Sequence, residues 1–490
     1  MRASPLQHAR TVVRCAGSAA QRPKSNTSMP KHTKAQVAII GGGLSGLACA
    51  QKLKDLGISS TVFDTGKNAP GGRCSSREIV QDGHVLRFDH SMQCFSASSE
   101  GFGQVVKEWI SAGVVQPWDG SVVGTVNAGG EFQPRGNEAP LLYVGVERGN
   151  KAIVDHLSQG LDIDRPVWVS RVQRQPGGKW DVYEYRDFQG AFDYIVVAHN
   201  GKCADRLMST AGVPGIHKLL KVRFQPAPTP APVMQLCSIW VLMVAFPKSL
   251  GLPLEGCFVK GVPEISWIAN NTAKMAKTQA SPNDLECWTI ISSRTFGAQH
   301  KVPQEFVPPL KDVEVKSLLM KAFEKAVGRE LPKPCFQKAQ LWGAAVPMNT
   351  LETPEGCCFD AQANVGICGD WLVSPSVEGC IVSGHAMAEK IASHASGNDQ
   401  SSVGLDATFK ICSTPAIGDF PGTDLKNDEI VPDMRKLGGG NRGGRGQGRG
   451  RGRGGGRGRG QGRGRGRGRG RGEGNPSRSG GGGQNVSSLA

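Results

Sequence analysis

Apolar and polar positions near the start of the chain follow the pattern of a strand, a helix and a second strand. Residues 37–40 form a short apolar run rich in β-branched side chains, which is typical of a buried strand. After a glycine-rich turn, apolar residues recur at helical spacing as far as Gly57, which suits a helix end. Residues 60–63 form a second apolar run. This order predicts one strand–helix–strand unit.

Further strands are predicted where short apolar runs lie between turn residues, at residues 167–172, 180–185, 194–198, 239–246 and 365–371. Residues 149–157 and 381–393 predict helices, and residues 105–150 alternate short strands with glycine turns. The run 194–198 is apolar throughout, as in a parallel strand buried on both faces, so we expect it to join the first sheet. The pattern predicts an α/β fold.

The first turn carries the glycine spacing of a dinucleotide site. Gly41, Gly43 and Gly46 fill a Gly-x-Gly-x-x-Gly pattern between the predicted strand and helix. In that pattern the first glycine makes the turn, the second admits a pyrophosphate, and the third lets the helix pack on the strand. Asp64 ends the second strand 18 residues beyond Gly46, where an acid that binds ribose hydroxyls is expected. Together these features predict a bound dinucleotide.

Two later segments have features of phosphate-binding corners. Gly71 and Gly72 let the backbone approach an anion, and Arg73 adds a planar charged group suited to phosphate. Far along the chain, Gly369 and Asp370 end a predicted strand just before the last predicted helix. We expect the first segment to close the pyrophosphate pocket and the second to form another phosphate- or ribityl-binding corner.

The sequence shows no nucleophile triad and no acid–base pair, so the catalytic residues stay unassigned. His90, Trp342 and Trp371 are candidates for a wall beside the cofactor, and a purely packing role is the alternative for each. Asp89 precedes His90 directly, but neighbouring residues of a strand face opposite sides, which excludes a local relay.

Composition limits the possible partners of the folded part. The chain of 490 residues has a formal net charge of +16. Seven Lys and Arg lie in residues 1–34, and thirteen Arg lie in residues 437–490, so the body between them is near neutral. The fourteen cysteines include no Cys-x-x-Cys, which favours a reducing compartment and argues against zinc. No apolar run is long enough to span a membrane.

The two ends of the chain suggest a subcellular location and a second function. Residues 1–34 lack acids and a secretory core, which favours an organellar transit peptide for a chloroplast or a mitochondrion. If this leader is not a transit peptide, cytoplasm or nucleus is expected. Residues 437–490 are rich in glycine and arginine, so we expect no fold there. RNA binding and a solvated extension are both open for this tail.

These motifs resemble those of FAD-dependent amine oxidase-type flavoproteins, most closely the renalase-like branch of plants and algae. The resemblance covers residues 36–395. Besides the motifs above, it rests on Phe88, Asp89, His90, Gln93, Phe95, Leu341, Trp342, Pro347, Ser383 and Gly384. It implies a Rossmann-type FAD-binding domain of three layers, with an inserted α+β substrate domain on a mixed or antiparallel sheet and disordered termini.

The resemblance also implies where a non-covalent FAD would be held. The pyrophosphate would meet Gly41, Gly43, Ser45 and Gly46, with help from Gly72 and Arg73. Asp64 would bind the adenosine ribose, the backbone of Val172 the adenine, and Asp370 the ribityl or pyrophosphate side. The backbone around Val377, Glu378 and Gly379 would lie near the flavin, where a helix N-terminus stabilises negative charge.

The implied domain boundaries are discontinuous. The FAD-binding domain would comprise residues 35–80, 150–204 and 356–396, and the substrate domain residues 81–149 and 205–355. Residues 397–436 would link this body to the tail.

The implied activity is an oxidase that takes a hydride from a small reduced substrate, such as a reduced nicotinamide isomer, with oxygen as acceptor. Ser376 stands where amine oxidases carry an aromatic cage residue, which argues against a simple amine substrate. An amine-oxidising enzyme and an isoprenoid desaturase are the enzymatic alternatives. A flavin-binding, RNA-associated protein acting through residues 437–490 is the alternative of another class.

Overall fold

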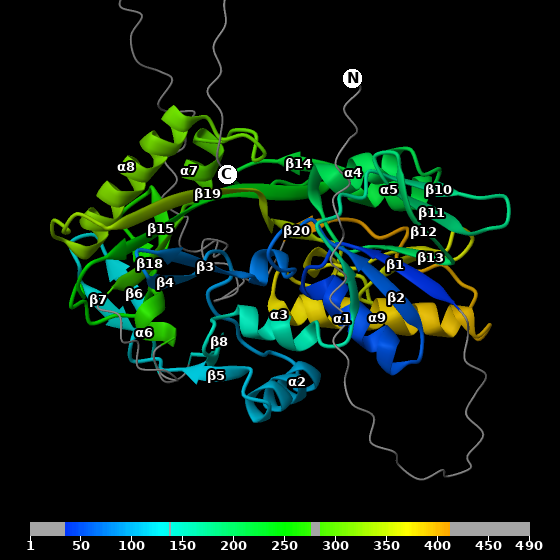
Figure 1. Ribbon diagram of the computed structural model, residues 1–490, viewed down its shortest axis with the longest axis horizontal. Coiled ribbons are helices and arrows are strands. Elements are labelled where there is room, and N and C mark those ends of the chain that lie inside the picture. Colours follow the sequence, from blue (N-terminus) through cyan, green and yellow to red (C-terminus); the bar gives the residue numbers. More distant parts are fainter. Residues whose placement is uncertain (1–34, 137–138, 276–284, 412–490) are drawn as a thin grey trace, which may run out of the picture. The chain divides into compact units, whose positions relative to one another are not determined.

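The computed structural model describes residues 35–136, 139–275 and 285–411. The predicted transit peptide, the arginine-rich tail and most of the predicted linker lie outside these residues. Two sheets organise the described part (Figure 1).

The first sheet has six strands in the order β21-β22-β13-β1-β2-β9. Its strands are β1 (Gln36–Ile40), β2 (Ser59–Phe63), β9 (Asp162–Asp164), β13 (Tyr194–Val197), β21 (Cys358–Asp360) and β22 (Val365–Ile367). The predicted return of the chain is confirmed, because β13 pairs with β1 in parallel. Only β21 runs antiparallel to its neighbour. The mostly parallel order puts the strand ends that carry the glycine turn and Asp64 at one edge.

Both faces of this sheet are covered, which makes three layers. Helices α1 (Leu44–Asp55) and α9 (Val377–Ala395) bury one face, where Val37 and Ile39 meet Leu53 and Met387. The opposite core contains residues of the sheet, of helices α4 (Gly201–Ser209) and α5 (Pro214–Leu220), and of a small antiparallel sheet. That small sheet consists of β10 (Arg171–Arg174), β11 (Trp180–Glu184) and β12 (Asp187–Phe192). The predicted Rossmann-type architecture is confirmed.

The second large sheet is mixed and has eight strands. They are β6 (Val123–Asn127), β7 (Phe132–Pro134), β14 (Val222–Phe224), β15 (Met234–Phe246), β16 (Gly256–Lys260), β17 (Ile265–Asn270), β18 (Glu286–Ser292) and β19 (Phe336–Pro347). Every residue of β15 is buried, which extends the predicted strand at residues 239–246. Helix α8 (Pro309–Val327) packs on one face through Val315, Leu319 and Phe323.

Shorter elements connect or cover the two sheets. The hairpin β3 (Ser76–Gln81) and β4 (His84–Asp89) packs on β15 and β18, where Leu86 and Phe88 meet Met243. The others are α2 (Glu100–Ser111), β5 (Val115–Trp118), β8 (Leu142–Gly145), α3 (Lys151–Leu157), α6 (Asn271–Met275), α7 (Arg294–Gln299), β20 (Asn349–Thr350) and β23 (Lys410–Ile411), with 3₁₀ turns η1 (Gly72–Cys74) and η2 (Asp370–Leu372).

Four sequence predictions of local structure need correction. The strand predicted at residues 365–371 ends at Ile367, and the 3₁₀ turn η2 follows it. Residues 105–111, which were predicted to form strands and turns, belong to helix α2. The side chain of its N-cap residue, Ser99, accepts a hydrogen bond from the Phe102 amide. Strand β10 begins at Arg171, four residues later than predicted. Helix α9 begins at Val377, earlier than the predicted 381, because the Ser376 side chain caps it.

The described residues include twelve cysteines, and most of them are buried. Burial raises the pKa of Cys257 to about 12 and that of Cys287 to about 11. In the part of the chain that the structure describes, no helix is long and apolar enough to cross a membrane.

A buried ion pair joins strand β4 to helix α6. The Lys274 ammonium of α6 lies 2.5 Å from the Asp89 carboxylate at the end of β4, and it donates to the Gln93 carbonyl. Both side chains are almost completely buried. Asp89 also accepts from the Ser76 hydroxyl and the Asn150 amide, so its charge is fully engaged.

Replacing Lys274 with Met should therefore destabilise the protein by about 3–5 kcal/mol, because the Asp89 charge stays buried without its counter-charge. Urea unfolding of the two proteins measures this loss. Lys107→Met, which changes an exposed lysine of α2, is the matched control. Equal stability of the two variants would contradict the assigned role of the pair.

Candidate functional site

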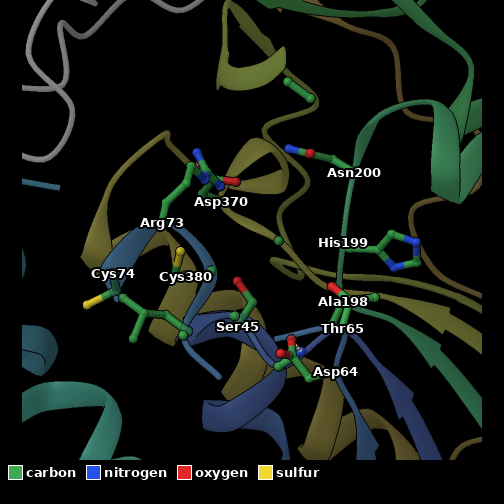
Figure 2. Close-up of a pocket in the computed structure, with 18 of the residues that line it drawn as sticks. Ser45, Asp64, Thr65, Arg73, Cys74, Ala198, His199, Asn200, Asp370 and Cys380 are labelled. Atoms are coloured by element: carbon green, nitrogen blue, oxygen red, sulfur yellow. Dashed lines mark hydrogen bonds and ion pairs between the residues drawn. The ribbon is translucent and has the colours of Figure 1, made fainter. Parts of the chain in front are cut away.

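One cavity of about 470 Å³ opens at the edge of the first sheet (Figure 2). Its lining comes from segments far apart in the chain, including Gly41 to Ser45, Asp64, Gly71 to Cys74, Ala198 to Asn200 and Gly369 to Trp371. All of them follow strand ends of the first sheet or lie beside them, which is where open α/β sheets bind ligands.

The three glycines of the first turn differ in the room that they leave for a side chain. Gly41 has a φ of +116°, and a Cβ there would lie 2.9 Å from the Ala198 carbonyl oxygen. A Cβ on Gly46 would lie 2.0 Å from the Gly41 carbonyl oxygen, so this glycine lets helix and turn touch. Gly43 is different, because a Cβ there would meet no protein atom within 4 Å. This side of Gly43 therefore faces open space.

The N-terminus of α1 suits an anion. Gly43 is the N-cap, no side chain caps the helix, and no acidic residue lies in the first turn. The first amide groups of a helix have no partner within the helix, and they attract negative charge. Ser45 of this turn, predicted to meet a pyrophosphate, also lines the cavity.

Asp64 lines the cavity at the end of β2 and braces the glycine turn. Its Oδ2 accepts from the Gly42 amide at 2.9 Å, and its Oδ1 accepts from the Gly66 amide at 2.7 Å. The carboxylate thus lies where the spacing from Gly46 predicts it. Each carboxylate oxygen can accept a second hydrogen bond, which leaves capacity for ribose hydroxyls.

The second glycine segment lies directly against the first. The Gly71 amide donates to the Gly42 carbonyl at 2.7 Å. This contact places Arg73 at the cavity, where its guanidinium lies 2.8 Å from the Asp370 carboxylate and donates to the Ala345 carbonyl. Burial disfavours the charge of Arg73, but Asp370 outweighs it and holds the pKa of the guanidinium above its usual range. The two predicted corners are therefore one site.

The start of α9 forms another side of the cavity. Ser376 and Val377 line it, and Ser376 accepts from the Gly379 amide at 2.9 Å. The side chain of Glu378 turns away and accepts from the amides of Ser98 and Ser99. Burial alone would raise the pKa of Glu378, but these bonds lower it overall. Glu378 and Gly379 do not line the cavity, although the resemblance implied their backbone there.

The structure does not bring Val172 to the cavity. Val172 pairs with Val182 inside β10–β11, and its side chain is buried in the core. Residues 167–169 line the cavity instead. Residues 167–169 lie at the cavity because the Val167 amide donates a hydrogen bond to the Asp64 carbonyl. The chain therefore reaches the cavity before β10 begins.

Two of the three predicted wall residues line the cavity. These are Trp342 of β19 and Trp371, whose ring stacks on Phe409. His90 lies behind Trp342, with ring centroids 5.6 Å apart, and its carbonyl accepts from the Trp342 indole. Burial, followed by the charge of Arg77, lowers the pKa of His90 to about 3. His90 is therefore neutral at physiological pH and supports the wall.

Sequence reasoning missed several lining residues, among them Met92, residues 167–169, His199, Asn200, Cys203, Gln304 and Glu305. His199 and Asn200 could have been found, because they follow a predicted parallel strand at its carboxyl end. Gln304 and Glu305 lie in the loop between α7 and α8, and no local pattern marks them. Among the described residues, no group of three His, Cys, Asp or Glu is placed to hold a metal ion.

Comparisons with known proteins agree with this architecture. Residues 39–109 match the model of an NAD(P)-binding Rossmann-like domain. The structure resembles cyclohexylamine oxidase from Brevibacterium oxydans IH-35A, with a TM-score of 0.51 and 12% identity over 73% of this chain and 99% of that one. It also resembles a putrescine oxidase triple mutant redesigned in cofactor binding, with a TM-score of 0.50 and 12% identity over 73% and 98% of the chains. The fold is thus the fold of these amine oxidases.

Gly46 and Gly43 should respond differently to substitution. Gly46→Ala should lower the free energy of unfolding by about 1–3 kcal/mol, because its Cβ meets a backbone oxygen that has little room to shift. Gly43→Ala should cost less than about 1 kcal/mol, because its Cβ enters open space. Urea unfolding of both variants tests this, and equal losses would contradict the assigned roles.

Proposed function

We propose that the protein is an FAD-dependent oxidoreductase that takes a hydride from a small reduced substrate, with oxygen as the electron acceptor. One observation carries this proposal. The glycine turn with Asp64, the segment of Arg73 and the corner at Asp370 lie around a single cavity. The start of α9 lies at the same cavity. The similarity in fold to two amine oxidases supports the same conclusion.

The residues present fit a non-covalent FAD. The open side of Gly43 and the uncapped start of α1 suit its pyrophosphate, and Arg73 adds a positive charge on the same cavity. Asp64 suits the adenosine ribose, residues 167–169 the adenine, and Asp370 the ribityl side. A cavity of this volume falls within the range of cofactor sites, about 300–1,000 Å³.

FAD, when bound, supplies the acceptor for the hydride. The chain has to orient the donor and exclude water, since hydride transfer depends on orientation more than on a side-chain acid or base. Trp342, fixed by its bond to His90, provides a rigid apolar wall for this purpose. Val377 lies in the first turn of α9, where the positive end of the helix dipole stabilises negative charge.

A reduced nicotinamide is the substrate that we favour. Ser376, where amine oxidases of the resembling family have an aromatic residue, lines the cavity and caps α9. Ser376 therefore does not supply the aromatic side chain that the resemblance implies for an amine cage. Amine oxidation and isoprenoid desaturation remain the enzymatic alternatives, and the fold of the two similar oxidases favours the first of them.

RNA association is the alternative of another class. It rests on the composition of residues 437–490, which lie outside the described residues. RNA retention that persists after deletion of this tail would rule it out.

The absorbance of the purified protein tests the proposed function. We expect a flavin spectrum, and anaerobic addition of a reduced nicotinamide should bleach it, with recovery when air is admitted. A series of primary amines and an isoprenoid serve as competing donors. Bleaching by amines alone would contradict the nicotinamide hypothesis and favour amine oxidation. If no donor bleaches the flavin, the proposal of an oxidoreductase is wrong.

Asp64→Asn tests the cofactor site separately from catalysis. The amide keeps one oxygen acceptor for the glycine turn but loses the charge that strengthens hydrogen bonds from ribose hydroxyls. We expect FAD affinity to fall about tenfold, measured by quenching of flavin fluorescence on binding to the FAD-free protein. Asp55→Asn, on the exposed end of α1, is the control. Unchanged affinity would show that Asp64 serves the turn only.

A further inference from the structure

The segment after β13 carries an asparagine that departs from the usual rule for helix ends. Asn200 is the N-cap of α4, and its backbone is extended, with φ −121° and ψ −171°. An asparagine in this position usually accepts a hydrogen bond from an amide of the first helical turn. The Asn200 side chain makes no such bond. It also has no other hydrogen-bond partner among the residues that the structure describes.

The residue after Asn200 explains why the cap is not made. Gly201 has a φ of +79°, a left-handed conformation that turns the chain between Asn200 and the rest of α4. A Cβ on Gly201 would lie 3.2 Å from the Ala344 Cβ, so this turn packs on β19. On the other side of Asn200, the His199 Nδ1 lies 3.0 Å from the Ile40 carbonyl oxygen. The backbone of Asn200 is therefore fixed from both sides.

The Asn200 side chain is directed into the cavity, toward the ion pair of Arg73 and Asp370. All three residues line the cavity. Strand β19 holds both sides of it, because the Arg73 guanidinium donates to the Ala345 carbonyl and Gly201 packs on the residue before Ala345. Figure 2 shows the Asn200 side chain pointing toward the side of the view where Arg73 and Asp370 lie. One donor group and one acceptor are thus presented to a ligand between them.

We propose that the Asn200 carboxamide binds FAD where its second phosphate joins the ribityl chain, opposite Arg73 and Asp370. This inference rests on the proposed function, which gives Arg73 to the pyrophosphate and Asp370 to the ribityl side. A carboxamide suits this junction, because its N–H donates to a phosphate oxygen and its carbonyl accepts from a hydroxyl. Asp64 and residues 167–169 already serve the adenosine, so Asn200 extends the site on the flavin side.

Calorimetric titration of the FAD-free protein with AMP, ADP and FAD tests this contact. Along this series the ligand gains first the second phosphate and then the ribityl flavin. In Asn200→Ala we expect the affinity for FAD to fall about tenfold and the affinity for AMP to stay unchanged. A fall for ADP as well would assign the bond to the phosphate, and a fall for FAD alone would assign it to the ribityl chain.

Asn200→Asp is the sharper variant. It has nearly the same size, but it loses the N–H donors and puts a second carboxylate opposite Asp370 and the phosphates. We expect its affinity for FAD to fall about a hundredfold at neutral pH. Asn398→Asp is the control, because Asn398 is exposed and does not line the cavity. Since Asn200 caps no helix, FAD-free Asn200→Ala should unfold at the same urea concentration as the wild type.

Several outcomes would overturn this inference. Unchanged affinity for FAD in both variants would show that Asn200 does not contact the cofactor. Equal losses for AMP, ADP and FAD would place its effect at the adenosine or in the fold. A lower urea midpoint for Asn200→Ala would assign the side chain a structural role. If the wild type binds no FAD, the proposed function fails as well, whereas FAD binding that is equal in wild type and variants contradicts only the role of Asn200.

Discussion

The ion pair between Arg73 and Asp370 is the contact on which the site depends. It joins a segment near the start of the chain to one near its end, and the Asp370 side chain is almost fully buried. A buried charge is tolerated only with a partner, so each residue requires the other. The hydrogen bond from the Gly71 amide to the Gly42 carbonyl positions the segment of Arg73. Turn η2, which follows β22, positions Asp370.

The parts of the site that follow local rules could be predicted from the sequence. The glycine turn, Asp64 and Asp370 lie at strand ends of a parallel sheet, and their roles depend on a few neighbouring residues. Helix α2 could not be recognised in the same way, because Gly101 and Gly103 lower its intrinsic helix propensity. Its stability comes from burial of Phe102, Val106 and Trp109, which the sequence alone does not show.

The remaining parts depend on contacts between distant segments. Residues 167–169 line the cavity because Val167 is bound to Asp64, and no spacing rule predicts that contact. Gln304 lies at the cavity beside Trp342, because its side chain accepts a hydrogen bond from the Gly343 amide of β19. The first sheet thus provides the part of the cavity lining that sequence motifs predict. The second sheet and its loops provide further lining residues, whose approach to the cavity is seen only in three dimensions.

Burial of the thiols affects how readily an oxidase of this kind would be oxidised by hydrogen peroxide. An oxidase that passes electrons to oxygen forms hydrogen peroxide, which attacks thiolates much faster than thiols. In this chain burial raises the pKa of Cys257, Cys287 and Cys357 far above physiological pH, so these sulfurs stay protonated. The same packing that fills the core therefore protects these three thiols from the product of the proposed reaction.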